Sequence, residues 1–285
     1  MISDSLTQQI ARILSLLEAK WASSPAPNFD YCAFVWEKNA NQKGFLKGID
    51  FNAIRLSDLH FIDAQKEALL QNTRQFVAGF PANNALLTGA RGSGKSSLIR
   101  AILQELAPLG LKIIEVNQAD LTDLPEIVSL IEHQNARFVI FCDDLSFEAD
   151  DASYKALKSL LDGSLRAPNE NILIYATSNR RHLMPDFFSE NEASDEIHPF
   201  ERTEEKISLS DRFGLWLSFY PLGQNDFLSI VAHWLLFYGL EKQDIQSAQQ
   251  EALQWALARG SRSARVAVQF ARHFAGKKAW EKSQA

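Results

Sequence analysis

The sequence contains few cysteines. Cys32 and Cys142 are the only two among 285 residues, so the chain has neither a disulfide framework nor the paired cysteine spacing of a zinc site. Cys142 lies in an apolar run, where a buried thiol is the ordinary expectation. This cysteine content fits a reducing compartment, and we expect a cytoplasmic protein.

Long apolar runs and an excess of basic charge are also absent. No uninterrupted apolar stretch approaches membrane-spanning length, and polar residues interrupt residues 1–21, which lack the apolar core of a signal peptide. The formal net charge is −6, which gives no general attraction toward nucleic acid. We therefore expect no membrane association and no high-affinity binding of duplex DNA.

The remaining composition is that of an ordinary globular protein. With 46% hydrophobic and 22% charged residues, the chain suits one large α/β domain with appendages or two modest domains. Apolar residues recur at helical spacing over residues 4–20 and 63–78, and each stretch predicts an amphipathic helix. The periodicity of residues 29–54 is undecided between helix and strand.

Short apolar strands alternate with helices from residue 84 onward. Strands are predicted at 84–88, 112–116, 138–142, 172–176 and 215–220. Apolar strands separated by helices indicate a parallel sheet covered on both faces. Residues 186–206 contain eight acidic residues and predict a long acidic loop, whereas only helical patterns follow residue 225.

These patterns together predict an α/β fold with three layers, α/β/α, around a parallel five-stranded sheet. We expect an N-terminal helical segment over residues 1–75, a nucleotide-binding α/β core over 76–224, and a C-terminal helical lid over 225–285.

The most informative motif follows the first of these strands. It is a complete phosphate loop, whose glycines let backbone N–H groups wrap around phosphate oxygens. Lys95 is expected to reach the β- and γ-phosphates and the Ser96 hydroxyl to bind Mg²⁺. Because a helix begins here, its N-terminal dipole also favours anions. The predicted nucleotide-binding residues are Gly89, Ala90, Arg91, Gly92, Ser93, Gly94, Lys95, Ser96 and Ser97.

A second motif indicates hydrolysis. The apolar strand at 138–142 ends in Asp143 and Asp144, the Walker B arrangement, in which Asp143 is expected to hold Mg²⁺ through its water shell. Asp144 occupies the place of the group that polarises the attacking water. Glutamate is commoner there, so the shorter Asp144 favours either slow hydrolysis or help from Glu148.

A strand-end amide completes this set. Asn179 follows the strand at 172–176, next to the Walker B strand in the predicted sheet. An amide there can hydrogen-bond both the γ-phosphate and the attacking water. The alternative is an asparagine that caps or turns the chain after a strand.

The order of these motifs resembles the AAA+ ATPases. Four strings are similar, more narrowly, to an uncharacterised bacterial AAA+ family catalogued as a domain of unknown function: NALLTGARG (84–92), FCDDLSFE (141–148), YATSNRRHL (175–183) and SLSDRFGL (208–215). The likeness covers roughly residues 55 to 275, and a more distant one connects the chain to replication-initiator and helicase-loader ATPases.

The resemblance assigns two arginines. Arg212 matches the arginine finger that enters a neighbouring subunit's site, which implies a homo-oligomer in the form of a ring or open ring; Arg180 and Arg181 are alternates. Arg265 matches the second sensor on the lid, with Arg262 as its alternate. Adenine would lie between residues 59–62 and the lid near Ile230.

Three functions follow from these residues. The first is an ATP- and Mg²⁺-dependent hydrolase that remodels an unknown protein or protein–nucleic-acid assembly. The second is a weakly hydrolysing switch that recruits a partner. The third, a GTPase or phosphotransferase, is disfavoured because no Asn-Lys-x-Asp string is present. The basic residues after position 258 are the only feature favouring nucleic acid, and a solvated basic face explains them equally well.

Overall fold

A central sheet organises the protein. The computed structural model describes residues 12, 26–51, 54–147, 151–162, 170–180 and 209–284; the predicted helix at 4–20 and the predicted acidic loop at 186–206 lie outside them, Arg12 excepted. The sheet has seven strands in the order β2-β1-β4-β5-β6-β3-β7. The strands are β1 (Ala33–Lys38), β2 (Gly44–Ile49), β3 (Ala85–Gly89), β4 (Leu111–Val116), β5 (Arg137–Cys142), β6 (Ile172–Ser178) and β7 (Leu215–Phe219).

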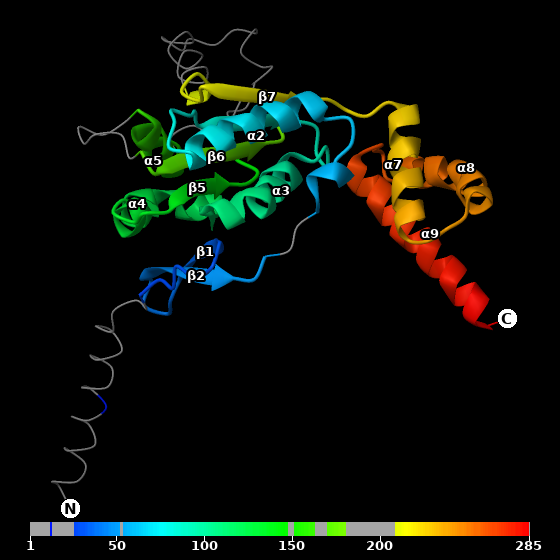
Figure 1. Ribbon diagram of the computed structural model, residues 1–285, viewed down its shortest axis with the longest axis horizontal. Coiled ribbons are helices and arrows are strands. Elements are labelled where there is room, and N and C mark those ends of the chain that lie inside the picture. The colour runs from blue at the N-terminus through cyan, green and yellow to red at the C-terminus, as the bar shows by residue number, and fades with distance from the viewer. Residues whose placement is uncertain are drawn as a thin grey trace, which may run out of the picture.

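The prediction of five strands is therefore corrected to seven. The five predicted strands are β3 to β7, which pair with one another in parallel, and the two additional strands come from the stretch of undecided periodicity. They form an antiparallel hairpin, whose β1 pairs in parallel with β4. The segment 1–75 is thus not purely helical, because this hairpin extends one edge of the sheet (Figure 1).

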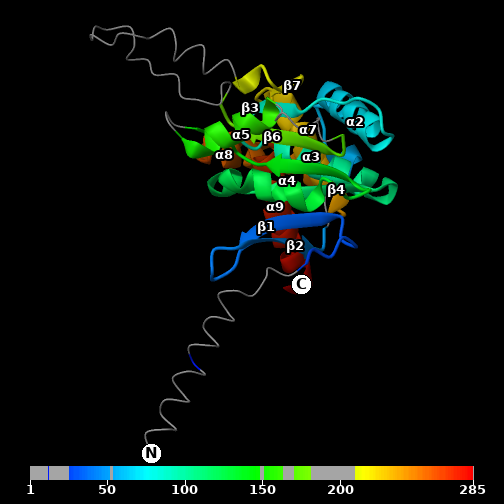
Figure 2. The ribbon, with the colours of Figure 1, turned by 90° about the vertical axis from the view of Figure 1, so that its left-hand side faces the viewer.

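Helices cover both faces of the sheet, as the alternation of strand side chains requires. On β5, Ile140 packs into one hydrophobic cluster and its neighbour Phe141 into the other. The first cluster includes α4 and α5, and the second includes α2 and α3, so that α2 and α5 lie on opposite sides of the sheet (Figure 2). These helices and the short 3-10 turns are α2 (Asp63–Val77), α3 (Lys95–Leu106), α4 (Leu124–Ile131), α5 (Ala152–Leu161), η1 (Leu56–Asp58), η2 (Ala107–Leu109) and η3 (Gln118–Asp123).

The C-terminal helices form a separate bundle at one end of the sheet (Figure 1). They are α7 (Gln224–Phe237), α8 (Lys242–Ala258) and α9 (Ala264–Gln284). Their hydrophobic core, which includes Phe227, Val231 and Phe270, is distinct from the two clusters on the sheet. In the described part of the chain, no helix is both long and apolar enough to cross a membrane.

Candidate nucleotide-binding site

The phosphate loop connects β3 to α3, as predicted. Its first glycine, Gly89, has φ +129°, and a β-carbon there would lie 1.9 Å from the carbonyl oxygen of Phe219 at the end of β7. Gly94 has φ +103° and precedes Lys95, the first residue of α3. Glycine is therefore required at both ends of the loop by close approach and by left-handed backbone.

Lys95 lies at the centre of this loop, with an exposed fraction of only 6%. Its ammonium donates to the carbonyl oxygens of Gly89 and Ala90 at 2.7 and 3.0 Å and to Oδ1 of Asn179 at 3.0 Å. Burial lowers the pKa of Lys95, although Asp144 and Asp143 oppose that effect. Phosphate oxygens are charged acceptors, which make stronger hydrogen bonds to an ammonium than neutral carbonyls do.

The two residues predicted to hold Mg²⁺ are in contact. The Ser96 hydroxyl donates to Oδ1 of Asp143 at 2.5 Å, and Arg100 Nη2 lies 3.9 Å from the other carboxylate oxygen of Asp143. The described residues contain no cluster of three or more ligating His, Cys, Asp or Glu side chains. One hydroxyl and one carboxylate fit Mg²⁺ in a nucleotide site, where phosphates and water complete the coordination.

Asp144 and Asn179 also meet at this end of the sheet. The Asn179 amide nitrogen donates to Oδ1 of Asp144, while its amide oxygen accepts from Lys95. Arg91 Nη2 lies 3.7 Å from the other carboxylate oxygen of Asp144. The predicted binding lysine, water-activating acid and strand-end amide are therefore linked side chain to side chain.

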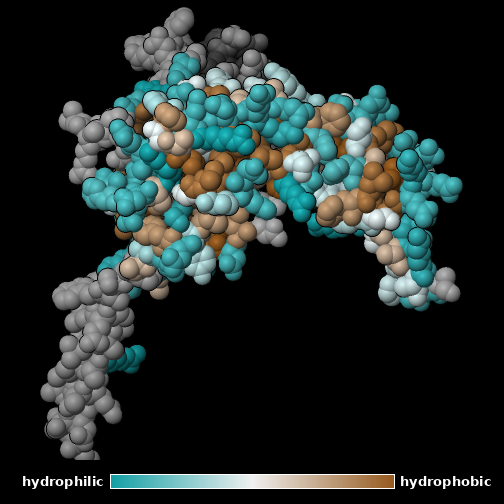
Figure 3. Space-filling model, in the orientation of Figure 1, coloured by the Kyte–Doolittle hydropathy of each residue, from teal (hydrophilic) through white to brown (hydrophobic). Residues whose placement is uncertain are grey.

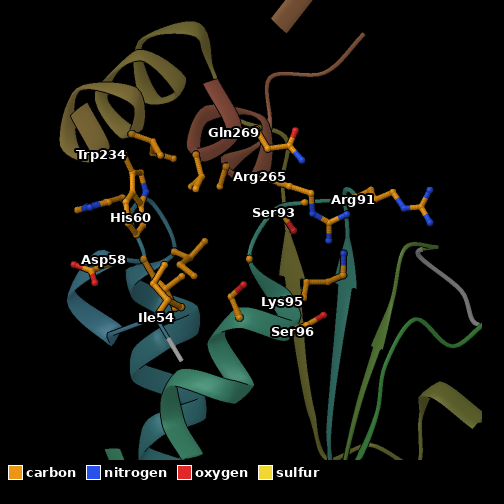
Figure 4. Close-up of a pocket in the computed structure, with 18 of the residues that line it drawn as sticks. Ile54, Asp58, His60, Arg91, Ser93, Lys95, Ser96, Trp234, Arg265 and Gln269 are labelled. Carbon is orange, nitrogen blue, oxygen red and sulfur yellow. The ribbon is translucent and has the colours of Figure 1, made fainter. Parts of the chain in front are cut away.

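A cleft of about 940 Å³ joins these groups to the lid. Arg265, from the first turn of α9, projects into it toward the phosphate loop (Figure 4), and its backbone N–H donates to the carbonyl oxygen of Gly92 at 3.3 Å. Arg262, the alternate, lies instead on a second groove of about 720 Å³, which shares Arg91 and Ser93 with the cleft.

The other end of the cleft is mainly apolar. It is lined by Ile54, Leu59, Ile62, Ile230 and Trp234, so the two segments predicted to enclose adenine face each other across it. His60 adds a polar group at this end (Figure 4). Apolar walls with a few polar groups are typical of sites for planar ligands.

Some predicted residues lie elsewhere. Arg212 does not line the cleft; it precedes β7, at the end of the sheet opposite the phosphate loop, and its Nε contacts Asp162. Arg180 is exposed beside Asn179, whereas Glu148 and Arg181 lie outside the described residues.

The sequence analysis did not single out every residue of the cleft, and three of those it missed contact Asp143 or line the apolar end. Thr177 and Arg100 contact Asp143, and Trp234 lines the apolar end. Thr177 belongs to one of the four quoted strings, and Arg100 lies five positions after Lys95. A threonine or an arginine alone, however, is too common to be predicted as a site residue from the sequence.

Comparison with solved structures places the fold. Two variants of RuvB from Thermotoga maritima match with a TM-score of 0.50 and 16% identity, over 75% of this chain. A chain of the HORMA:CdnC:Trip13 complex of E. coli MS115-1 matches with a TM-score of 0.49, 14% identity and coverage of 79% of this chain and 93% of that one. ORC1 of Aeropyrum pernix, in complex with DNA, matches with a TM-score of 0.49 and 17% identity. The match covers 73% of this chain and 57% of that one.

The two RuvB likenesses show the fold, which is similar to that of AAA+ P-loop NTPases. This chain spans 62% and 61% of the two RuvB chains, less than two thirds of their length. No curated protein matches the sequence. A family profile covers residues 30–278, and the chain thus belongs to the family described as a protein of unknown function (DUF815).

Proposed function

We propose that this protein is an ATP hydrolase that couples hydrolysis to the remodelling of a protein or protein–nucleic-acid assembly. The observation that carries the proposal is the link Lys95–Asn179–Asp144 at the phosphate end of the cleft. It joins a phosphate-binding cation to a carboxylate suited to activate water.

The other site residues fit this chemistry. Lys95 and the loop amides bind the phosphates, and Arg265 adds a second cation from the lid. Ser96 and Asp143 would hold Mg²⁺, which neutralises phosphate charge when bound. Asp144 accepts a proton from the attacking water, and Asn179 aligns that water for in-line displacement.

A homo-oligomer belongs to the proposal because of Arg212. This side chain lies far from its own chain's phosphate loop, so a role at a γ-phosphate requires a neighbouring subunit. Lid movement would change the contact between Arg265 and Gly92, which gives a route from nucleotide state to assembly.

A weakly hydrolysing switch is the second candidate. It is favoured by the pairing of Asp144, whose carboxylate oxygens contact Asn179 and Arg91. Both carboxylate oxygens therefore have partners already, with which an attacking water must compete. On this alternative, ATP binding would recruit a partner with little turnover.

Nucleotide binding and phosphate release test both candidates. Lys95→Ala should abolish ATP binding, whereas Asp144→Asn should retain binding and lose turnover by about 10²-fold or more, the scale of a general base. Lys47→Ala, at an exposed salt bridge with Glu37 on the hairpin, is the matched control. Binding without release by the parental protein favours the switch, and a preference for GTP over ATP overturns both candidates.

A further inference from the structure

The side chain of Thr177 occupies the junction between the two strands that carry the carboxylates and the amide. Thr177 is the penultimate residue of β6 and is 1% exposed. β6 pairs in parallel with β5, with Cys142 opposite Ala176. Asp143 and Asp144 follow directly after β5, which brings their backbone alongside Thr177.

The Thr177 hydroxyl both donates and accepts a hydrogen bond. It donates to Oδ1 of Asp143 at 2.6 Å and accepts from the backbone N–H of Asp144 at 2.9 Å. The carbonyl oxygen of Thr177 also accepts from the N–H of Leu145 at 2.7 Å. One threonine therefore fixes three consecutive residues of the chain after β5.

Asp144 has a backbone conformation that few residues adopt. Its φ is +55°, in the left-handed region, where a β-carbon is unfavourable and aspartate and asparagine are the best tolerated residues other than glycine. The Asp144 carboxylate accepts from Asn179, which lies 35 positions later in the sequence, so a tertiary contact supports this backbone. Glutamate is not among the residue types enriched in this region, which accounts for the shorter acid at this position.

We propose that Thr177 is a positioning residue for the hydrolysis proposed above. Its hydroxyl orients Asp143 toward the Mg²⁺ position and holds Asp144 in the left-handed conformation that aims the shorter carboxylate. This inference rests on the proposed function.

Two hydroxyl groups hold the Asp143 carboxylate in place. Oδ1 of Asp143 accepts from both Ser96 and Thr177. The Ser96 hydroxyl would also ligate Mg²⁺, whereas the Thr177 hydroxyl bonds Asp143 and the backbone N–H of Asp144. Thr177 thus keeps Oδ1 occupied, so that Oδ2, which lies 3.9 Å from Arg100 Nη2, would face the cation's water shell.

Removal of this hydroxyl without loss of volume is the direct experiment. Thr177→Val should lower kcat about 10- to 100-fold and raise the Mg²⁺ concentration needed for half-maximal ATP binding about tenfold, the usual scale for an outer-sphere partner. The KM for ATP should change less than about twofold, since the valine touches no phosphate-binding group. Thr177→Ser should restore both parental values.

Thr73→Val is the matched control. Thr73 is also fully buried, and its hydroxyl bonds the Leu69 carbonyl and the Tyr175 hydroxyl at 2.6 and 2.8 Å, away from the cleft. It should lower Tm without changing the Mg²⁺ requirement. If Thr177→Val shows only the same behaviour, Thr177 is structural and the inference is wrong.

The left-handed backbone has its own readout, independent of turnover. Asp144→Gly should have a higher Tm than Asp144→Ala, because glycine alone adopts φ +55° without strain. Asp144→Glu should lower both Tm and kcat; a higher kcat would overturn the inference.

The two proposals can fail separately. If the parental protein binds ATP in a Mg²⁺-dependent way but does not hydrolyse it, only the proposed hydrolase function is refuted. The role of Thr177 is then still tested by the Mg²⁺ dependence of ATP binding in Thr177→Val. No ATP binding by the parental protein refutes both.

Discussion

The backbone N–H of Arg265 donates to the carbonyl oxygen of Gly92 at 3.3 Å. This bond ties the first turn of α9 in the lid to the middle of the phosphate loop. Gly92 has φ +74°, and a β-carbon there would lie 2.8 Å from Oγ of Ser263 and 3.2 Å from Cβ of Arg265. The lid and the loop therefore approach more closely than a side chain at position 92 allows.

Gly92→Ala should weaken ATP binding about tenfold or more. The added methyl group pushes Ser263 and Arg265 away from the loop, and a loss of about 1.4 kcal/mol of binding free energy is tenfold in Kd. Titration calorimetry with ATP measures the change. An alanine in the left-handed backbone conformation also costs about 1–2 kcal/mol of stability, so the control variant must carry the same backbone strain.

Gly110→Ala is that control. Gly110 has φ +94°, and its added β-carbon meets nothing within 4 Å. It should lose a similar amount of unfolding free energy and keep the parental Kd. Equal Kd values for the two variants would show that the contact between lid and loop contributes nothing to binding.

Arg212 should act in trans. Arg212→Ala is expected to lower turnover about 10²-fold or more while ATP binding persists, because an arginine finger stabilises the transition state in a neighbour's site. Phosphate release from mixtures of variants distinguishes this from loss of the Asp162 contact.

The mixture pairs Arg212→Ala with Lys95→Ala. Each variant alone is inactive, but in a mixed oligomer an Arg212→Ala subunit binds ATP beside a Lys95→Ala subunit that supplies an intact arginine. Turnover should reappear on mixing. If every ratio stays inactive although sedimentation shows mixed oligomers, Arg212 is no finger, and Arg180→Ala tests the alternate.

Local sequence signals predict the parallel strands and the phosphate loop well. Residues 138–142 of β5 form one apolar run, and Gly89, Gly92 and Gly94 of the loop have positive φ. The hairpin escapes such signals because its support is distant: β1 pairs with β4 about 80 positions later, and the Trp36 indole donates to Asp123 at 2.9 Å. Long-range pairing of this kind has no sequence period.

The candidate site likewise has one part that local sequence signals predict and one part that they do not. Lys95, Ser96 and the two aspartates stand in motifs with known spacing, so their meeting is predictable. The left-handed backbone of Asp144 is not, because it depends on tertiary hydrogen bonds: Asp144 accepts from Asn179 and donates its N–H to the Thr177 hydroxyl. Motif residues are thus predictable, whereas the residues that orient them come from the structure.

The contact of His60 with the lid should make stability depend on pH. The rings of His60 and His233 on α7 lie 4.3 Å apart, and Nε2 of each is buried; that of His60 has no hydrogen-bond partner among the described residues, and that of His233 lies 3.5 Å from Oδ1 of Asp58. Burial lowers the pKa of His60, and so do the charges of His233 and Lys66, while Asp58 and Asp63 act in the opposite direction.

The sign of the effect follows from linkage. Below the ordinary pKa of 6.5, the unfolded chain binds a proton at His60 that the folded chain resists, so the free energy of unfolding decreases as the pH falls from 6.5 through the lowered folded pKa. His60→Phe keeps a ring beside His233 and removes the titration. When the pH is lowered from about 7.5 to about 5.5, a range that spans the ordinary histidine pKa, the Tm of His60→Phe should therefore fall less than that of the parental protein.

His133→Phe is the control. The His133 side chain is 88% exposed, and this variant should lose as much Tm over the same pH range as the parental protein. Parallel Tm curves for all three proteins would mean that His60 does not resist protonation, and that acid weakens the fold through other groups.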